Sequence, residues 1–333
     1  MAMKLGMLGM WHSHATGIVR QVAAHPEEFQ LTAFWEGDEK LAGQKAEQWG
    51  KLLPEVKRYH SPAELLRQPL DGVVVEGRVY ENVALARLAL EAGFPVMLEK
   101  PAGTTMKDFQ SLIDLAQRKH LRVQMIYLFR YMSAVLEMLK RGKQGELGDI
   151  YEFRARLPKD VSQYQAYVEE LVRYPGGMFF EMAGHSIDMQ VSLLGEPRKV
   201  TPFLGHHHRS PGKFVDHGIA MFEYERAWSI IEIPALEVVP HQRRIEVYGS
   251  RGACIIPHLG SGHLANKNVQ PCEVFISGDK QWQHLEPPAA VLQIADLREF
   301  AATVAGKKDP DYSFEHDLIV HRALLEASGM LDG

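Results

Sequence analysis

Blocks of hydrophobic residues alternate with helix-like stretches over the first 126 positions of the chain. The short apolar blocks predict buried strands, and the stretches between them predict helices of about 10–15 residues. The expected strands are 4–8, 30–36, 71–76, 95–98 and 121–126, and the main helices are 15–24, 39–49, 80–92 and 106–119. This alternation is typical of an α/β fold with a doubly wound parallel sheet, so we predict a first domain with this fold over residues 1–126.

The pattern changes near residues 126–130 to a series of short strand-like segments. These segments are 150–157, 200–204, 214–224, 228–233, 244–248 and 253–256. Such a series is typical of an antiparallel sheet, so we predict a second domain over residues 127–313 that binds substrate and forms oligomer contacts. Helices 291–304 and 314–330 finish the chain, and we expect the last one to pack back on the first domain.

Composition narrows the class of protein. A chain of 333 residues is long for one core, which agrees with two domains. Its 37 basic and 42 acidic residues give a net charge of -5, which offers no footprint for nucleic acid. The only cysteines, Cys254 and Cys272, support neither a disulfide framework nor a cysteine zinc site. No apolar run reaches the ~18 residues of a membrane helix, so we expect a cytoplasmic protein without membrane partners.

The segment Glu99-Lys100-Pro101 follows a short apolar strand and carries candidate chemistry. In an open α/β sheet the carboxyl end of a strand faces the ligand crevice. A lysine held there can donate a proton or polarise a carbonyl, while Pro101 removes a backbone donor and stops the strand. The alternative for Lys100 is a solvated side chain at a strand end.

The turn after the first strand is the place where a dinucleotide pyrophosphate would meet a helix N-terminus. The expected Gly-x-Gly-x-x-Gly fingerprint reads Gly9-Met10-Trp11-His12-Ser13-His14, so only the first glycine is present. Ser13, together with His12 or His14, can supply phosphate donors in place of glycine amides. These residues can equally be polar turn residues that bind no ligand.

Glu36 ends the second predicted strand, roughly 20 residues past the turn. An acid at this point can bind both ribose hydroxyls and repels a 2′-phosphate, so it favours NAD over NADP. The alternative for Glu36 is a solvated acid.

A predicted helix over residues 179–194 carries Glu181, His185 and Asp188 at i, i+4 and i+7, and therefore on one face. A carboxylate one turn from a histidine can orient the imidazole and raise its pKa, which suits a general acid or base near neutral pH. An ordinary solvated polar stripe is the alternative.

Further polar residues precede and follow this helix. Tyr164 lies in a region rich in tyrosine and arginine that suits a sugar-like ligand or an ordinary surface. The run His206-His207-His208 points to a pocket-lining loop or an oligomer contact, because consecutive strand residues alternate faces and rarely share one ion. We therefore expect no metal.

Three motifs resemble the Gfo/Idh/MocA family, the glucose–fructose oxidoreductase and inositol dehydrogenase type, over nearly the whole chain. They are Glu99-Lys100-Pro101 after Leu90–Gly93, the segment Gly176–Asp188 followed by Leu193–Pro197, and the turn Ile245–Gly252. The resemblance implies a Rossmann domain followed by an α/β domain with a large, open, mostly antiparallel sheet, and a homodimer or homotetramer. It also implies that Gly77 and Glu99 contact the cofactor and that Arg130 lies near the substrate. The chain departs from the family at Gly77–Asn82, which replaces the common Thr-Pro-Asn-x-x-His segment, and at Glu181, which replaces an aspartate.

These features together predict an NAD(P)-dependent oxidoreductase that acts on a secondary alcohol or carbonyl of a sugar, cyclitol or similar polyol. His185 would exchange the hydroxyl proton, Lys100 would hydrogen-bond the same oxygen, and Glu181 would bind an adjacent hydroxyl. Asp188 is a supporting candidate for the substrate site. The alternatives are an NAD-dependent glycoside hydrolase on the same scaffold and a non-catalytic ligand or dinucleotide sensor.

Overall fold

The computed structural model describes residues 1–163, 165–207, 212–237, 242–259 and 269–331. The chain forms two units. The first contains Met1–Tyr127 and Val291–Phe314, and the second contains Leu128–Ala290 and the residues from Glu315 onward. Within the described part of the chain, no helix has both the length and the apolar character needed to span a bilayer.

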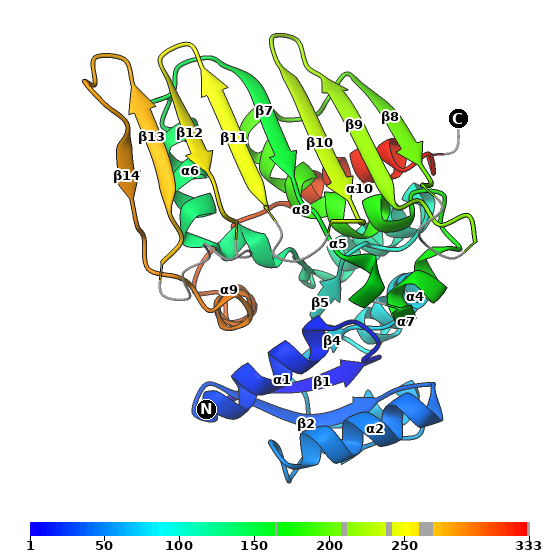
Figure 1. The fold of residues 1–333 in the computed structure, drawn as a ribbon. Coiled ribbons are helices and arrows are strands. Elements are labelled where there is room, and N and C mark those ends of the chain that lie inside the picture. The colour runs from blue at the N-terminus through cyan, green and yellow to red at the C-terminus, as the bar shows by residue number, and fades with distance from the viewer. Residues whose placement is uncertain (164, 208–211, 238–241, 260–268, 332–333) are drawn as a thin grey trace. The chain divides into compact units, whose positions relative to one another are not determined.

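The first unit is built on a six-stranded parallel sheet with the order β3-β2-β1-β4-β5-β6 (Figure 1). Its strands are β1 (Met3–Leu8), β2 (Phe29–Trp35), β3 (Lys57–Arg58), β4 (Gly72–Val75), β5 (Val96–Glu99) and β6 (Val123–Ile126). Every residue of β4, β5 and β6 is buried, as expected for parallel strands covered on both faces. The predicted doubly wound sheet is therefore confirmed.

Helices alternate with these strands as the sequence predicts. They are α1 (His14–Ala24), α2 (Glu39–Gly50), α3 (Pro62–Leu65), α4 (Val79–Glu91) and α5 (Met106–Lys119). Side-chain caps begin three of them. Asp38 accepts a hydrogen bond from the Leu41 amide, Ser61 accepts one from the Glu64 amide, and Thr105 accepts one from the Asp108 amide.

Helix α9 (Leu292–Val304) also belongs to the first unit, although the sequence analysis assigned its residues to the second domain. Gln124 in β6 is buried and donates a 2.7 Å hydrogen bond to Asp296 Oδ1 of this helix. Arg298 of the same helix pairs with Glu28 at the start of β2. The contacts that hold α9 thus join residues about 170 and 270 positions apart.

The second unit contains an eight-stranded sheet with the order β14-β13-β12-β11-β7-β10-β9-β8. Its strands are β7 (Ile150–Arg156), β8 (Lys199–Gly205), β9 (His217–Glu223), β10 (Trp228–Pro234), β11 (Arg244–Gly249), β12 (Gly252–Ile256), β13 (Cys272–Ile276) and β14 (Gln283–Leu285). Only the β7–β10 pair is parallel among the pairs in this sheet of described residues. The expected large, mostly antiparallel sheet is confirmed, and β13 and β14 extend it beyond the predicted strands.

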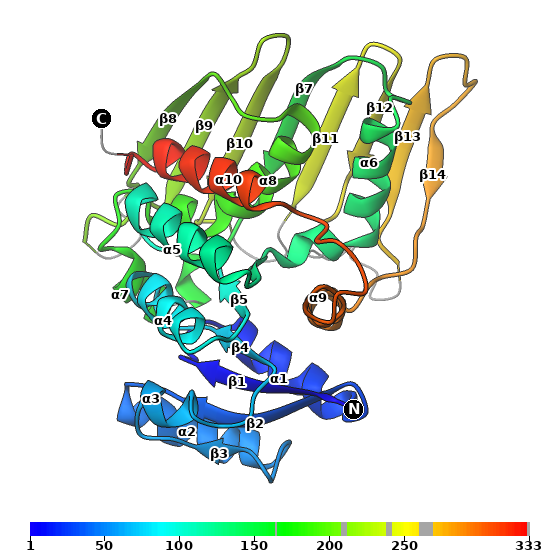
Figure 2. The ribbon, with the colours of Figure 1, turned by 180° about the vertical axis from the view of Figure 1, so that it is seen from behind.

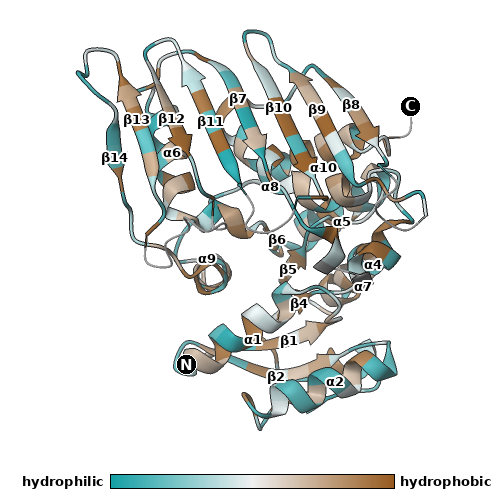
Figure 3. Cartoon of the chain, viewed as in Figure 1, coloured by the Kyte–Doolittle hydropathy of each residue, from teal (hydrophilic) through white to brown (hydrophobic). Residues whose placement is uncertain are grey.

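One face of this sheet is covered by α6 (Ser133–Lys143), α8 (Gly177–Leu194) and α10 (Phe314–Ala327), as Figure 2 shows. The short helix α7 (Gln165–Leu171) precedes α8. Buried and partly exposed residues alternate along β9 and β10, although Figure 3 shows hydrophobic residues along the middle of both strands. This period of two lets one face carry the core while the other stays accessible.

Helix α10 belongs to the second unit from Glu315 onward, whereas the sequence led us to expect that it packs back on the first domain. Asp317 in its first turn pairs with Arg130 at 2.6 Å, and both side chains are fully buried. A buried ion pair of this kind holds the helix in place, because separating the charges would leave them unpaired in a region of low dielectric. The helix ends at Ala327, three residues before the predicted end.

Candidate active site

The carboxyl ends of β1, β2, β4 and β5 lie at one edge of the parallel sheet, and chemistry-bearing residues follow each of them. The turn 9–14 follows β1 and Glu36 follows β2, while Glu76 follows β4 and Lys100 follows β5. This edge is where an open α/β sheet binds its ligands.

Gly9 makes the close turn that opens this edge. Its φ is +76°, and a Cβ built on it would lie 2.5 Å from the Cα of Gly77. The Gly9 amide donates to the Trp35 carbonyl at 2.8 Å. Gly9 is therefore required by its close contact with the backbone of Gly77, in the turn after β4.

Glu36 is 4% exposed, so the alternative of a solvated acid is wrong. Its carboxylate accepts hydrogen bonds from the amides of Met10 at 2.8 Å and Asp38 at 3.0 Å. Arg78 Nη1 lies 3.9 Å from Glu36 Oε1. Because a carboxylate has about four lone-pair sites, Glu36 can hold the turn and still accept hydrogen bonds from ribose hydroxyls.

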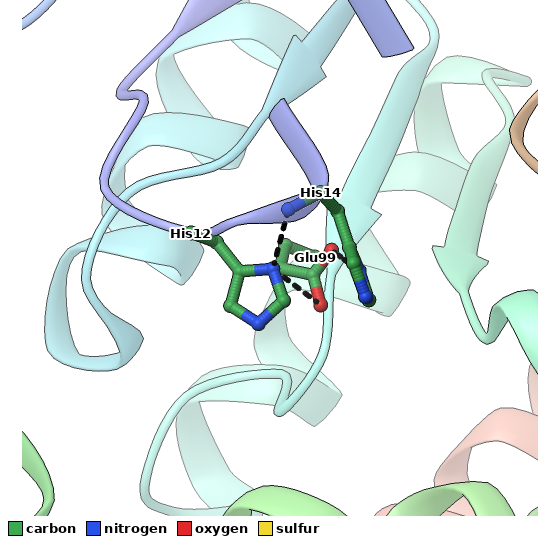
Figure 4. Close-up of side chains that lie close together, drawn as sticks. All are labelled: His12, His14 and Glu99. Atoms are coloured by element: carbon green, nitrogen blue, oxygen red, sulfur yellow. Dashed lines mark hydrogen bonds and ion pairs between the residues drawn. The ribbon is translucent and has the colours of Figure 1, made fainter. Parts of the chain in front are cut away.

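His12 and His14 lie against Glu99, as Figure 4 shows. His14 Nδ1 is 3.0 Å from Glu99 Oε2, and His12 Nδ1 is 3.5 Å from Glu99 Oε1. Burial is the main cause that lowers the pKa of His14, and Glu99 partly opposes it. Burial alone would raise the pKa of Glu99, but His12, His14 and Lys100 outweigh it and hold that pKa below its usual range.

Glu76 is a residue of this group to which the sequence analysis gave no role. It is fully buried, and its Oε2 lies 3.7 Å from His12 Nδ1. Burial, and then the negative charge of Glu99, raise the pKa of Glu76 well above its usual range. Glu76 directly follows β4, and β4 lies between β1 and β5 in the sheet. This position at the carboxyl end of a central strand was the signal that could have identified it.

Lys100 is 2% exposed, so the solvated alternative is wrong. Its positive charge is one of the causes that lower the pKa of Glu99, and it partly opposes the rise in the pKa of Glu76. The other predicted residues of the turn are less enclosed, because Trp11 is half-buried and Ser13, the N-cap residue of α1, is exposed.

In the second unit, α8 carries Glu181, His185 and Asp188, and all three side chains are buried. The alternative of a solvated polar stripe is therefore wrong. The His185 ring stacks on Phe129, with ring centroids 4.2 Å apart and planes 16° from parallel. This stacking fixes the plane of the imidazole, so its two nitrogen atoms keep defined directions.

Arg130 and Asp188 form a buried ion pair within the second unit. Arg130 Nε and Nη2 lie 3.0 and 2.6 Å from Asp188 Oδ1, and Arg130 Nη2 also pairs with Asp317. His316 Nε2 lies 2.8 Å from Asp188 Oδ1. Burial would raise the pKa of Asp188, but Arg130 and His316 outweigh it and lower that pKa. Sequence reasoning missed Asp317 and His316, because only the tertiary fold brings α10 to α8.

The remaining predicted residues lie elsewhere. Tyr164 and His208 lie outside the described residues. His206 Nδ1 lies 2.8 Å from the Phe214 carbonyl oxygen, and His207 Nδ1 lies 3.2 Å from Asp216 Oδ1. These two histidines are therefore held by the loop between β8 and β9.

The edge of the first sheet thus offers a glycine turn, a helix N-terminus, an acid at the end of β2 and a buried lysine. That set can bind a dinucleotide, and the lysine can stabilise a developing negative charge. The buried imidazole of His185 can accept or donate a proton.

Family models and relatives agree with this fold. Residues 3–127 match the model described as an oxidoreductase family with an NAD-binding Rossmann fold, and residues 135–255 match the GFO/IDH/MocA C-terminal domain. The chain therefore belongs to the Gfo/Idh/MocA family of oxidoreductases, as the motifs indicated.

Several named proteins are similar to the chain. It is 26% identical to an uncharacterized oxidoreductase of Schizosaccharomyces pombe, over 56% of this chain and half of the relative's length. It is 23% identical to a Bacillus subtilis scyllo-inositol 2-dehydrogenase (NAD(+)), over 80% of this chain and 77% of the relative. A scyllo-inositol 2-dehydrogenase (NADP(+)) of the same organism is 24% identical over 53% of this chain and 47% of that protein. Among solved structures, UDP-N-acetylglucosamine 3-dehydrogenase GnnA from Acidithiobacillus ferrooxidans has the same fold, with a TM-score of 0.78 at 16% identity over 99% of this chain and 98% of that one.

Proposed function

We propose that the protein is an NAD(P)-dependent dehydrogenase that acts on a secondary alcohol or carbonyl of a sugar, cyclitol or similar polyol. The observation that carries this proposal is the buried Lys100 at the end of β5, on the same sheet edge as the Gly9 turn and Glu36. The family match and the relatives named as inositol dehydrogenases support the reaction class and the kind of substrate.

The residues present fit a dinucleotide. Gly9, with its φ of +76°, makes the tight turn after β1, and the N-terminus of α1 that follows can receive a phosphate. Gly77 and Glu99 belong to the same edge, with Trp11, His12, Ser13 and His14 in the turn. The nicotinamide would supply hydride transfer to and from a carbinol carbon.

Lys100 and His185 are the proposed acid/base pair. His185 would take the hydroxyl proton of the alcohol, or return it to the carbonyl. Lys100 would hydrogen-bond the same oxygen and stabilise its negative charge. Glu181 would bind an adjacent hydroxyl, while Arg130 and Asp188 support the substrate side through their ion pair.

NAD is the proposed cofactor, with NADP less favoured. The buried side chain of Glu36 would repel a 2′-phosphate and can accept hydrogen bonds from ribose hydroxyls. Arg78 does not reverse this preference, because its guanidinium already faces Glu36, Asp38 and Glu81.

A fluorescence titration with NADH and NADPH tests the cofactor part of this proposal directly. We expect saturable binding of NADH and weaker binding of NADPH. Equal affinity would remove the role given to Glu36, and the absence of binding by either would favour a sensor without dinucleotide.

A homo-oligomer and a cytoplasmic location are also proposed. Tyr151, Phe203 and Trp228 of the second sheet are 50–60% exposed, and large apolar side chains of this kind are candidates for a subunit contact. Sedimentation analysis would show a dimer or tetramer if this proposal is right and a monomer if it is wrong.

A further inference from the structure

The residues that replace the missing fingerprint glycines form a cluster with metal-ligand chemistry. We propose that His12, His14 and Glu99 bind a divalent transition-metal cation of the Zn²⁺ class. This inference differs from the expectation that the protein binds no metal. That expectation was based on the histidine run at 206–208, which is a different part of the chain. It also stands apart from the proposed dehydrogenase activity, because metal binding can be measured without cofactor or substrate.

The donor set suits such a cation. Two imidazole nitrogens and one carboxylate are the protein ligands of a common class of zinc site, in which a fourth position is left for another ligand. Each of the three residues offers one ligand atom, and these atoms lie within 4.8 Å of one another. His12 and Glu99 are buried and His14 is partly exposed, so the cluster is enclosed but has one accessible side.

The spacing of the atoms is that of a tetrahedral site. Zinc–ligand distances of about 2.0–2.2 Å place neighbouring ligand atoms roughly 3.3–3.6 Å apart. Glu99 Oε2 lies 3.0 Å from His14 Nδ1, and Glu99 Oε1 lies 3.5 Å from His12 Nδ1. These two distances involve different oxygens of Glu99, and the three ligand atoms lie within 4.8 Å of one another, so the side chains would have to move inward to surround one ion.

Both imidazoles turn the required nitrogen towards the centre of the cluster (Figure 4). His12 Nδ1 accepts a long hydrogen bond, 3.3 Å, from the His14 amide, so it carries a lone pair. His14 Nδ1 faces the Glu99 carboxylate, and a cation would replace the proton between them.

Glu76 supplies the second observation that points to a cation. Its two carboxyl oxygens and Glu99 Oε1 are buried, and within the described part of the chain no N–H group donates to them, while the Glu76 and Glu99 carboxyl groups face each other. Glu76 Oε2 lies 3.7 Å from His12 Nδ1, close enough to take the fourth position or to accept a hydrogen bond from a bound water. Two buried carboxyl groups so close together are stabilised by a positive ion.

A second group of potential ligands, Asp188, His316 and Asp317, does not carry the same inference. The Arg130 guanidinium already contacts both aspartates at 2.6 Å, so a cation occupies the centre of that group. The cluster in the first unit is different, because the charge nearest to its carboxylates on β4 and β5 comes from histidines and Lys100.

The test uses the full chain, stripped with a chelator and titrated with Co²⁺ and then with Zn²⁺. We expect one equivalent of Co²⁺ to give the intense visible bands of a four-coordinate site and Zn²⁺ to displace it. His14→Ala, chosen because His14 is partly exposed, should weaken binding at least about tenfold, and Glu99→Gln should do the same. His207→Ala is the matched control, a histidine beside a buried aspartate in the other unit, and should bind as the wild type does.

Circular dichroism and thermal melting show whether each variant is folded, and His14→Ala keeps the test valid if Glu99→Gln is not. The proposal is overturned if the wild type binds no Co²⁺ or Zn²⁺, or if folded His14→Ala binds as tightly as the wild type. It is also overturned if His207→Ala alone removes the site. None of these outcomes depends on whether NAD(P) binds, so failure of this inference is separate from failure of the proposed function.

Discussion

Replacing Arg130 by methionine should destabilise the second unit strongly, because Arg130 balances two buried carboxylates. Arg130, Asp188 and Asp317 are each 2% exposed or less, and the ion pairs are 2.6 Å long. Removing one partner of such a network typically costs about 3–5 kcal/mol. With a urea m-value of about 1–3 kcal/mol/M, the unfolding midpoint of the second unit should fall by at least about 1 M.

The measurement is a urea titration read by hydrogen exchange on peptides from α8 and α10, which separates the second unit from the first. Arg198→Met is the matched control, because Arg198 and Glu225 form an ion pair in the same unit with both side chains mostly exposed. Exposed pairs contribute about 0–1 kcal/mol, so this midpoint should hardly move. The triple variant Arg130→Met, Asp188→Asn, Asp317→Asn should recover part of the loss, because no charge is left unpaired.

Acidity gives a second readout of the same network. The pKa of folded Asp188 is lowered, so its contribution to stability is present above its ordinary pKa of 3.8 and is lost as the pH falls through the folded value. In Arg130→Met the buried carboxylates take up protons more readily. The difference in free energy of unfolding between the wild type and this variant should therefore become smaller as the pH falls. The structural reasoning is refuted if Arg130→Met unfolds at the same urea concentration as Arg198→Met. If in addition only the KM for substrate changes, Arg130 serves to bind substrate and does not stabilise the fold.

Three further variants test the cofactor and catalytic residues. Gly9→Ala forces a side chain into φ +76° and against Gly77, so the variant should lose at least about 1–2 kcal/mol of stability and bind NADH more weakly. The control is Gly43→Ala in α2, where a Cβ meets nothing within 4 Å, and this variant should gain about 0.5–1 kcal/mol of stability. Equal effects of the two substitutions on thermal melting would contradict the account. Glu36→Ser should narrow the preference for NADH over NADPH at least about tenfold in fluorescence titrations, since it removes the like charge facing a 2′-phosphate, and an unchanged ratio would exclude Glu36 as its source. Lys100→Met and His185→Asn should each lower kcat by about 10²–10⁴-fold in steady-state assays while cofactor affinity stays near that of the wild type, and wild-type turnover in both would remove the acid/base pair.

The sequence predicted the parts of the fold that depend on local pattern. The strands before Gly9, Glu36 and Lys100 are short apolar blocks followed by turn residues, and parallel pairing brings their ends to one edge. That is why the candidate residues of the first sheet could be identified together. The helix that carries His185 was likewise visible in its spacing, although its near-complete burial was not, because burial depends on what packs against every side.

Long-range contacts account for what the sequence did not reveal. Helices α9 and α10 are similar amphipathic segments at the end of the chain, and their assignment to different units depends on Gln124–Asp296 and Arg130–Asp317. Glu76 was given no role because its partners, His12 and Glu99, come from other parts of the sheet edge, and its position after β4 alone did not reveal them.

Transfer of deuterium from a carbinol carbon to the nicotinamide tests the central claim most directly. The protein would be incubated with NAD⁺ and a panel of sugars, cyclitols and acyclic polyols, each carrying deuterium on its secondary carbinol carbons. The account predicts that at least one of them yields carbonyl product and reduced nicotinamide carrying one deuterium, and that Lys100→Met forms far less of both. Bond cleavage in a substrate without accumulation of reduced nicotinamide, or no reduction with any member of the panel, would contradict it.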